Sequence, residues 1–316
     1  MVYIGVDLGG TKIAAGVVND NCEILCKDSI PSGASRPAAE IAADMADLCR
    51  NVAKKSGVDL ADVAWIGIGS PGSIDRENGV ILYANNINFL KTPLAALIRE
   101  HWDIPVHIDN DANAAALGEA YAGAAKGCRD AIMITLGTGV GGGIIIDRKI
   151  YSGFNANGAE LGHMVIVASG RPCTCGRNGC WEAYASVSGL IADTRAAMLA
   201  HPESAMWQLQ NGSIEHVSGK TAFDAARAGD AVAEEVVRQY REYVAIGITN
   251  LVNIFQPEVL CVGGAISKEG EYLLGPVREF VERERYTRYC AQTEIKIAAL
   301  GNDAGIIGAA MLGKSV

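Results

Sequence analysis

The sequence predicts an α/β protein of two similar domains that face each other across a cleft. Three observations favour this architecture. The chain has 316 residues, about twice the roughly 150 residues of an average domain. Apolar segments typical of buried strands alternate along the chain with segments whose apolar residues recur at helical spacing. A strand, a glycine-rich turn and a second strand occur near the start and recur from Ala131, which indicates an internal repeat.

The composition excludes several classes of protein. With 36 acidic residues against 27 Lys and Arg, the net charge of −9 argues against a nucleic-acid or membrane partner. No basic N-terminal region precedes an apolar run, and no apolar stretch reaches the roughly 18 residues of a membrane span. Nine cysteines in a chain of this size indicate reducing conditions, so the expected location is the cytoplasm.

The first part of the chain predicts a small α/β domain at residues 1–120. Short runs rich in Val and Ile, bounded by turn residues, predict its strands, and Ile41, Met45 and Val52 mark the buried face of its first helix. In chain order we expect strands at 2–7, 13–18 and 23–30, a helix at 36–56, a strand at 65–69, a helix at 93–102, a strand at 105–109 and a helix at 112–122. The final helix, at about 303–316, is expected to return to this domain.

The remaining residues predict a larger α/β domain at 121–302. Val236, Tyr240 and Val244 recur at helical spacing and mark one face of its longest helix. We expect strands at 132–139 and 140–146, helices at 184–200 and 230–253, and strands at 258–264 and 294–300. Residues 160–182 show no periodicity and are interpreted as an inserted segment.

A tight turn after the first strand is a candidate phosphate site. It has the sequence Asp7-Leu-Gly-Gly-Thr11, in which Gly9 and Gly10 allow backbone N–H groups to approach a phosphate and the Thr11 hydroxyl adds a donor beside Lys12. Asp7, at the end of the strand, suits a hydrated Mg²⁺. The alternative is a plain hairpin turn.

A second glycine-rich turn occupies the same place in the repeat. Its residues Gly137, Thr138 and Gly139 follow a strand, but no helix comes next, so the turn is neither a P-loop nor a dinucleotide fingerprint. Sheet curvature alone would also require glycine here. A glycine turn at the same place in both halves favours phosphate binding, because two facing turns would hold one nucleotide from both sides.

Four polar residues cluster where the strand at 105–109 passes into a helix. They are Asp109, Asn110, Asp111 and Asn113. One of them is expected to cap the helix, and a cap needs only one such side chain. The surplus predicts a polar site. A carboxylate at this point can accept the proton of a hydroxyl that attacks a phosphoryl group.

His163 and three clustered cysteines predict a metal site. Cys173, Cys175 and Cys180 lie within eight residues, ten residues after His163, and form the Cys₃His ligand set of a structural zinc site. Free thiols or a local disulfide are the alternatives. Such a site would fix the flanking carboxylates of Glu160 and Glu182, which could then accept hydrogen bonds from a polyol.

The order of these motifs resembles the ROK family of bacterial sugar kinases and repressors, which have the actin/hexokinase-like (ribonuclease H-like) ATPase fold. The resemblance covers essentially the whole chain. Its motifs are Asp7-Leu-Gly-Gly-Thr11, Asn110-Asp111-Ala-Asn113, Glu160-Leu-Gly-His163, the Cys-x-Cys-Gly-x-x-Gly-Cys run at 173–180, Gly263-Gly264-Ala-Ile-Ser267 and Asp303-Ala-Gly-Ile-Ile-Gly-Ala-Ala310.

The resemblance implies a role for each matching residue. Asp111 would be the catalytic base that deprotonates the 6-hydroxyl of a sugar for attack on ATP. His163 would bind both the zinc ion and the sugar through different ring nitrogens. The other implied sugar contacts are Asn110, Glu160, Glu182 and Asn85 or Asn86. The implied nucleotide contacts are Gly9, Gly10, Thr11, Gly137, Thr138, Gly263 and Gly264.

The expected activity is ATP-dependent phosphorylation of a hexose, with glucose as the first candidate and Mg²⁺ and zinc as cofactors. Kinases of N-acetylmannosamine, N-acetylglucosamine, fructose or mannose are alternatives within the family. A sugar-responsive repressor is disfavoured, because the motif at Asp7 leaves no room for a preceding DNA-binding domain and the chain is acidic. A non-catalytic sugar-binding module is disfavoured by Asp111 and both glycine turns. Many family members are dimers, so a homodimer is expected.

Overall fold

The computed structural model describes residues 1–84 and 86–314. Its backbone contacts distinguish two units. The first comprises Met1–Met133, Gly142–Ala159 and Ala298–Val316, and the second comprises Ile134–Gly141 and Glu160–Ile297. The predicted boundary near residue 120 stays a prediction.

The core of the first unit is a five-stranded sheet in the order β3-β2-β1-β4-β8. The strands β1 (Val2–Leu8), β2 (Lys12–Asn19) and β3 (Ile24–Pro31) are antiparallel neighbours, whereas β4 (Val63–Ser70) and β8 (Val106–Asn110) run parallel to β1. All five strands occur where the sequence predicts them. Because three parallel strands end at the same edge, the residues at their carboxyl ends come together.

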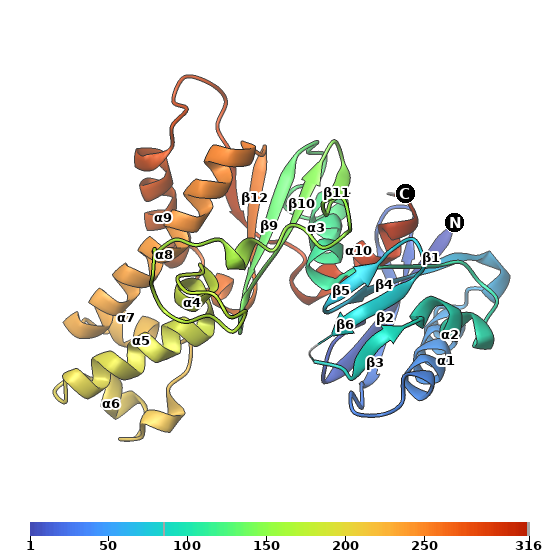
Figure 1. Cartoon of the computed structure of the whole chain (residues 1–316), viewed down its shortest axis with the longest axis horizontal. Helices are drawn as coiled ribbons and strands as arrows, with labels where there is room; N and C mark the ends of the chain where they lie inside the picture. The colour runs from blue at the N-terminus through green and yellow to red at the C-terminus, as the bar shows by residue number, and fades with distance from the viewer. Residues whose placement is uncertain (85, 315–316) are drawn as a thin grey trace. The chain divides into compact units, whose positions relative to one another are not determined.

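Helices cover this sheet with apolar faces. They are α1 (Ala38–Ser56), α2 (Leu94–His101), α3 (Asp111–Ala122) and α10 (Ala304–Met311). Figure 1 shows α10, from the end of the chain, beside α3. A Cβ atom on Gly308 would lie 1.6 Å from the carbonyl oxygen of Ala114, and one on Gly118 would lie 2.3 Å from that of Ala304. The two helices therefore approach this closely only because both positions are glycine.

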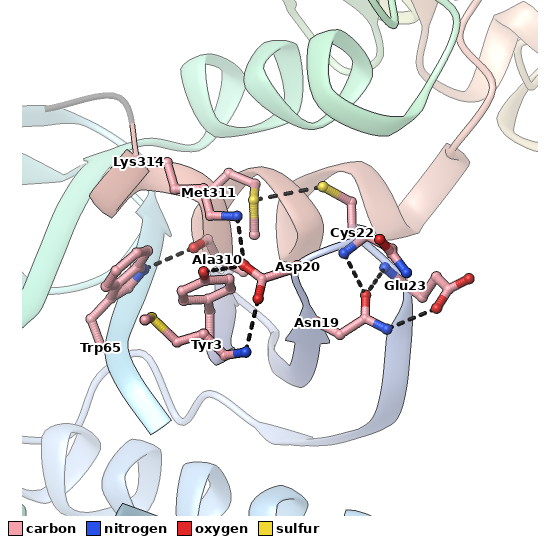
Figure 2. A network of polar contacts seen from close by, with 11 residues as sticks. Tyr3, Asn19, Asp20, Cys22, Glu23, Trp65, Ala310, Met311 and Lys314 are labelled. Carbon is pink, nitrogen blue, oxygen red and sulfur yellow. Dashed lines mark hydrogen bonds and ion pairs between the residues drawn. The ribbon is translucent and has the colours of Figure 1, made fainter. Parts of the chain in front are cut away.

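The carboxyl end of α10 is held by a network of aromatic and charged side chains (Figure 2). The indole N–H of Trp65 donates to the carbonyl of Ala310 at 2.8 Å, and the Trp65 ring stacks on Tyr3. Asp20 accepts hydrogen bonds from the Tyr3 hydroxyl at 2.5 Å and from Lys314 at 3.0 Å. This network anchors the last described turn of the chain on β1 and β4.

A small antiparallel sheet in the first unit is not predicted from the sequence. It consists of β5 (Ser73–Asp75), β6 (Val80–Ala84) and β7 (Phe89–Thr92), in that order. These strands have three to five residues each, too few to display a clear alternation of apolar and polar residues. The sheet exists because Ile74, Ile81 and Phe89 are buried in the core of the unit.

A second five-stranded sheet has the order β11-β10-β9-β12-β13. Its strands are β9 (Ala131–Leu136), β10 (Val140–Ile146), β11 (Lys149–Tyr151), β12 (Val259–Gly263) and β13 (Glu294–Ile297). In each of the two sheets the order in space is third, second, first, fourth, fifth by sequence. The predicted internal repeat is therefore confirmed by topology. The predicted strand at 294–300 is too long, because the N–H groups of Ala299 and Leu300 donate to the carboxylate of Glu119 instead of continuing a ladder.

The helices of the second unit are partly predicted. The predicted helix at 184–200 is divided at Ser186, whose hydroxyl caps the longer part by accepting from Gly189 N–H. Three helices were not predicted: α6 (Met206–Leu209), α7 (Thr221–Arg227) and α9 (Glu271–Glu284). The others are α4 (Glu182–Ala185), α5 (Val187–Ala200) and α8 (Ala231–Phe255). Among the described residues, no helix has both the length and the apolar character needed to cross a bilayer.

Candidate active site

Two carboxylates meet at the carboxyl edge of the first sheet. In the register of the parallel strands, Asp7 lies opposite Gly69, which in turn lies opposite Asp109. Asp111 follows directly at the start of α3, and its Cα would lie 3.5 Å from a Cβ on Gly69. Burial, together with the nearby negative charge of Asp111, raises the pKa of Asp7 to about 6. The fold thus gathers negative charge at one point, where a divalent cation would relieve the repulsion.

The polar cluster at residues 109–113 is mostly used for structure. Asp109 is buried and forms an ion pair with Arg76 at 2.6 Å, and it also accepts from the Asn113 amide at 3.0 Å. Asn110 caps α3, since its side-chain oxygen accepts from the N–H groups of Ala112 at 2.9 Å and Asn113 at 3.3 Å. The expectation that one of these residues is a helix cap is therefore correct.

Asp111 has no comparable structural partner among the described contacts. Its carboxylate accepts the N–H of the adjacent Ala112 at 2.8 Å and is exposed. The surrounding protein still desolvates the carboxyl and raises the pKa of Asp111. The arrangement leaves this carboxylate accessible as a proton acceptor.

The first glycine turn lies beside Asn86. A Cβ on Gly10 would be 2.9 Å from the Asn86 carbonyl oxygen, and the N–H of Gly9 closes the turn onto Lys12 at 2.9 Å. Thr11 and Lys12 are exposed. The turn therefore brings one of the two predicted asparagines near the glycines, while Asn85 lies outside the described residues.

Gly305 lies near this site, although the sequence did not predict a role for it here. A Cβ on Gly305, in the first turn of α10, would lie 3.1 Å from Cγ of Asp7. The amino end of α10 therefore faces the carboxylate, where the partial positive charge of a helix start is favourable. The glycines in 303–310 mark close packing, but their sequence does not reveal what they pack against.

The second glycine turn belongs to the second unit and is close to the turn at Gly264. The N–H of Gly137 bonds to the Gly139 carbonyl at 3.0 Å. Gly264 has φ of 86°, and a Cβ there would lie 2.4 Å from the carbonyl oxygen of Leu136. The turns at 137–139 and 263–264 are thus neighbours, and only glycine allows the contact at 264.

The four predicted metal ligands come together. The ligand atoms of His163, Cys173, Cys175 and Cys180 all lie within 4.8 Å of one another. Cys173 Sγ is 3.6 Å from Nδ1 of His163, and the sulfurs of Cys175 and Cys180 are also 3.6 Å apart. Ligands about 2.3 Å from a tetrahedral zinc ion would be separated by roughly 3.8 Å, so this donor set fits zinc. Nδ1 is the histidine nitrogen that faces the thiols, which leaves Nε2 for another partner.

Glycine and aromatic residues shape the segment at 160–182. Gly179 has φ of 82°, and a Cβ there would lie 1.8 Å from the Val167 carbonyl oxygen. Trp181 is fully buried and donates to the Tyr243 carbonyl of α8 at 2.8 Å. The glycine lets the chain turn around the ligands, and the tryptophan anchors the segment on α8.

The two glutamates that flank the metal ligands differ. Glu160 precedes the 3₁₀ turn Leu161–His163 and is exposed. Glu182 is partly buried, and its Oε2 accepts the Val140 N–H at 3.0 Å. The sequence gives no indication that Glu182 contacts Val140, because the two residues are 42 positions apart in the chain.

The chain is similar to known proteins over nearly its whole length. The chain matches the family model described as ROK family over residues 3–316. It is 38% identical to a glucokinase of Halalkalibacterium halodurans, over 99% of this chain and 94% of that protein. A xylose repressor of Caldicellulosiruptor bescii is 30% identical, over 96% of this chain but 76% of that protein.

A solved structure extends the similarity to three dimensions. A ROK family glucokinase from Streptomyces griseus, in complex with glucose and AMPPNP, is 39% identical with a TM-score of 0.80, and 99% of each chain is covered. This likeness and the two sheets of equal strand order confirm the predicted actin/hexokinase-like fold. Because both the family model and a relative above 30% identity span nearly the whole chain, the chain belongs to the ROK family.

Proposed function

We propose that this protein transfers the γ-phosphoryl group of ATP to the 6-hydroxyl of glucose. The observation that carries the proposal is the availability of Asp111, which remains accessible while Asp109, Asn110 and Asn113 are engaged in structural contacts. The similarity to glucokinases over 94% and 99% of two relatives supports the same activity.

Asp111 acts as the general base in this proposal. Its carboxylate takes the proton of the sugar hydroxyl as that oxygen forms a bond to the γ-phosphorus, and the bond from the γ-phosphorus to the bridging oxygen breaks to release ADP. A raised pKa makes the carboxylate a stronger base, provided that the pH keeps it ionised. Mg²⁺, bound near Asp7, would neutralise phosphate charge.

The sugar contacts are proposed from side chains with unused polar atoms. Asn110 uses its oxygen as the helix cap and donates one amide N–H to the Gly72 carbonyl at 3.3 Å, so its second amide N–H remains for a hydroxyl. Glu160 offers an exposed carboxylate and His163 offers Nε2. Glu182 and Asn86 complete the proposed set, together with Asn85.

The nucleotide contacts are proposed at the glycine turns. Because glycine carries no side chain, the backbone N–H groups of each turn can approach a phosphate closely. The proposed residues are Asp7, Gly9, Gly10, Thr11, Lys12, Gly137, Thr138, Gly139, Gly263 and Gly264. Zinc is the proposed ion at His163, Cys173, Cys175 and Cys180, where it would hold the segment at 160–182 in place.

Kinases of N-acetylmannosamine, N-acetylglucosamine, fructose or mannose are alternatives for the substrate. A coupled assay of ADP release over a panel of these sugars and glucose tests them directly. The proposal expects the highest kcat/KM with glucose. A higher value for another sugar would replace glucose as substrate, and inactivity with every sugar would favour a binding protein. Phosphate donors other than ATP belong in the same assay.

The assembly and location are proposed from exposed aromatic residues and from the cysteine content. Tyr286 and Tyr289 in the second unit are almost fully exposed, which is unusual for aromatic residues outside an interface. We propose a homodimer, to be tested by light scattering. We propose a cytoplasmic location, in line with nine cysteines in a chain of this size.

A further inference from the structure

Two side chains outside the glycine turns hold the backbone at residues 137–140, which we name the glycine loop. Glu182 Oε2 accepts the N–H of Val140 at 3.0 Å. The Ser188 hydroxyl, in the first turn of α5, donates to the carbonyl of Thr138 at 2.8 Å. The loop is therefore fixed by side chains as well as by its own turn.

The contacts with α5 determine which way the peptide groups of the loop point. The Val187 N–H donates to the Gly137 carbonyl at 2.8 Å, next to the contact between Ser188 and Thr138. In a trans peptide the C=O of one residue and the N–H of the next point in opposite directions. With both carbonyls turned toward α5, the N–H groups of Thr138 and Gly139 point away from it. Adjacent backbone N–H donors of this kind form sites that bind phosphate.

Glu182 is fitted closely against the loop. A Cβ on Gly139 would lie only 2.3 Å from Oε2 of Glu182, so glycine makes room for the carboxylate. The second oxygen, Oε1, faces the Thr174 hydroxyl at 3.4 Å and Cys173 Sγ at 3.7 Å. One side chain thus connects the metal-ligand cluster with the glycine loop.

We propose that Glu182 and Ser188 are positioning residues that aim the N–H groups of Thr138 and Gly139 at a phosphate of the nucleotide. This inference rests on the nucleotide role proposed for the glycine loop. Because Glu182 is also a proposed sugar contact, a sugar bound at Oε1 would hold the carboxylate that fixes Val140. Sugar and nucleotide then strengthen each other's binding by the same factor.

The test is the dissociation constant of Mg²⁺·AMPPNP, measured by titration calorimetry without sugar. E182A removes the acceptor for Val140 N–H and should weaken binding about tenfold or more, since the lost hydrogen bond is charge-assisted. S188A should weaken it about three- to tenfold. E234A is the matched control, because Glu234 is an exposed glutamate in the first turn of α8 with no described contact to the glycine loop, so its affinity should equal that of the wild type.

E182Q separates positioning from sugar binding. Glutamine keeps an oxygen for the Val140 N–H, so nucleotide affinity without sugar should stay within about threefold of wild type, while glucose affinity falls. In wild type, glucose should lower the dissociation constant of the analogue, and this effect should disappear in E182A. Zinc content, measured for every variant, shows whether a change in affinity arises from loss of the metal site.

Wild-type affinity for the analogue in E182A or in S188A would overturn the role of that residue. If E182A loses zinc, the positioning role is judged from E182Q and S188A instead. An equal loss of sugar and nucleotide affinity in E182Q would overturn the positioning role of Glu182. The reference is nucleotide binding by the wild type, which does not depend on turnover. A wild type that binds AMPPNP but phosphorylates no sugar contradicts the proposed function and leaves this test intact.

Discussion

The guanidinium of Arg76 lies 2.6 Å from the buried carboxylate of Asp109, two residues before α3 begins at Asp111. Arg76 also donates to the hydroxyl of Ser152 at 2.9 Å. The pair joins the small sheet, the end of β8 and the segment after β11 within the first unit. Burial raises the pKa of Asp109, and the charge of Arg76 opposes this effect.

Replacing Arg76 by methionine should destabilise the protein by roughly 3–5 kcal/mol, because a buried carboxylate loses its counter-charge. Urea unfolding of R76M measures the change. The double variant R76M/D109N should lose less than the sum of its single variants, since it removes both charges. R238M is the control, because the ion pairs of Arg238 with Glu235 and Glu242 are exposed and should be worth at most about 1 kcal/mol. Equal losses in R76M and R238M would contradict the importance of burial.

Asp111→Asn should lower kcat by roughly 10²–10⁴ and leave the dissociation constant of glucose nearly unchanged. The amide keeps the shape of the side chain but cannot accept the proton. Steady-state kinetics and calorimetry give the two quantities. D62N, an exposed aspartate in the turn Leu60–Asp62, is the control. Near-normal turnover in D111N would end the assignment of the base.

Asp7→Asn should stabilise the protein at pH 7.5 while it abolishes phosphoryl transfer. Burial and Asp111 raise the pKa of Asp7 to about 6, so between about pH 4 and 6 the folded protein binds more protons than the unfolded chain. Stability therefore falls as the pH rises through this interval, and the ionised carboxylate costs about 1–3 kcal/mol above it.

Thermal unfolding of D7N and wild type at pH 7.5 and pH 4 tests this sign. The gain in Tm should be present at pH 7.5 and nearly absent at pH 4, where Asp7 is protonated in wild type. A gain of the same size at both pH values would show that charge is not the cause. Added Mg²⁺ should raise the Tm of wild type more than that of D7N.

The proposed metal site should hold one zinc ion per chain in the wild type. Cys175→Ser should lower this content and destabilise the protein, since metal binding and folding of such sites are coupled. Elemental analysis and thermal unfolding provide the measurements. Cys290→Ser is the matched control, because Cys290 is an exposed thiol of the same unit that is remote in sequence from the ligands. Retention of one zinc ion in C175S would remove Cys175 from the ligand set.

Gly308→Ala should cost more than about 3 kcal/mol, because the added Cβ would meet the Ala114 carbonyl oxygen at 1.6 Å and the helices would have to separate. Gly57→Ala isolates the backbone strain that arises when a glycine with positive φ is replaced. Gly57 has φ of 74° with open space around it, so G57A should cost only about 1 kcal/mol of backbone strain. Similar losses in the two variants would argue against close packing of α3 and α10.

Local patterns in the sequence were sufficient to predict nine of the ten strands that the structure describes in the two five-stranded sheets, all but the three-residue β11, and the longest helices, α1 and α8. The repeat of one motif predicted a second, similar domain, and the second sheet indeed has the strand order of the first. The small sheet could not be predicted, since β5 has only three residues. The premature end of β13 depends on Glu119, which is 180 residues from Ala299 in the chain.

The site was predicted at the level of residue types but not of individual contacts. The spacing of Cys173, Cys175 and Cys180 is local, so it indicated the cluster that the structure brings together with His163. The sequence could not show which of the polar residues at 109–113 is left free, because that depends on Arg76, more than thirty residues earlier. The contact of Glu182 with Val140 was hidden for the same reason.

The place of α10 has a consequence for the synthesis of the protein. Its residues pack on β1, where a Cβ on Gly5 would lie 1.8 Å from the Ile306 carbonyl oxygen. A ribosome releases the first strand almost three hundred residues before this helix. We therefore expect the first unit to remain open along one face of its sheet while the second is being translated, and to complete its folding only after α10 has been synthesised.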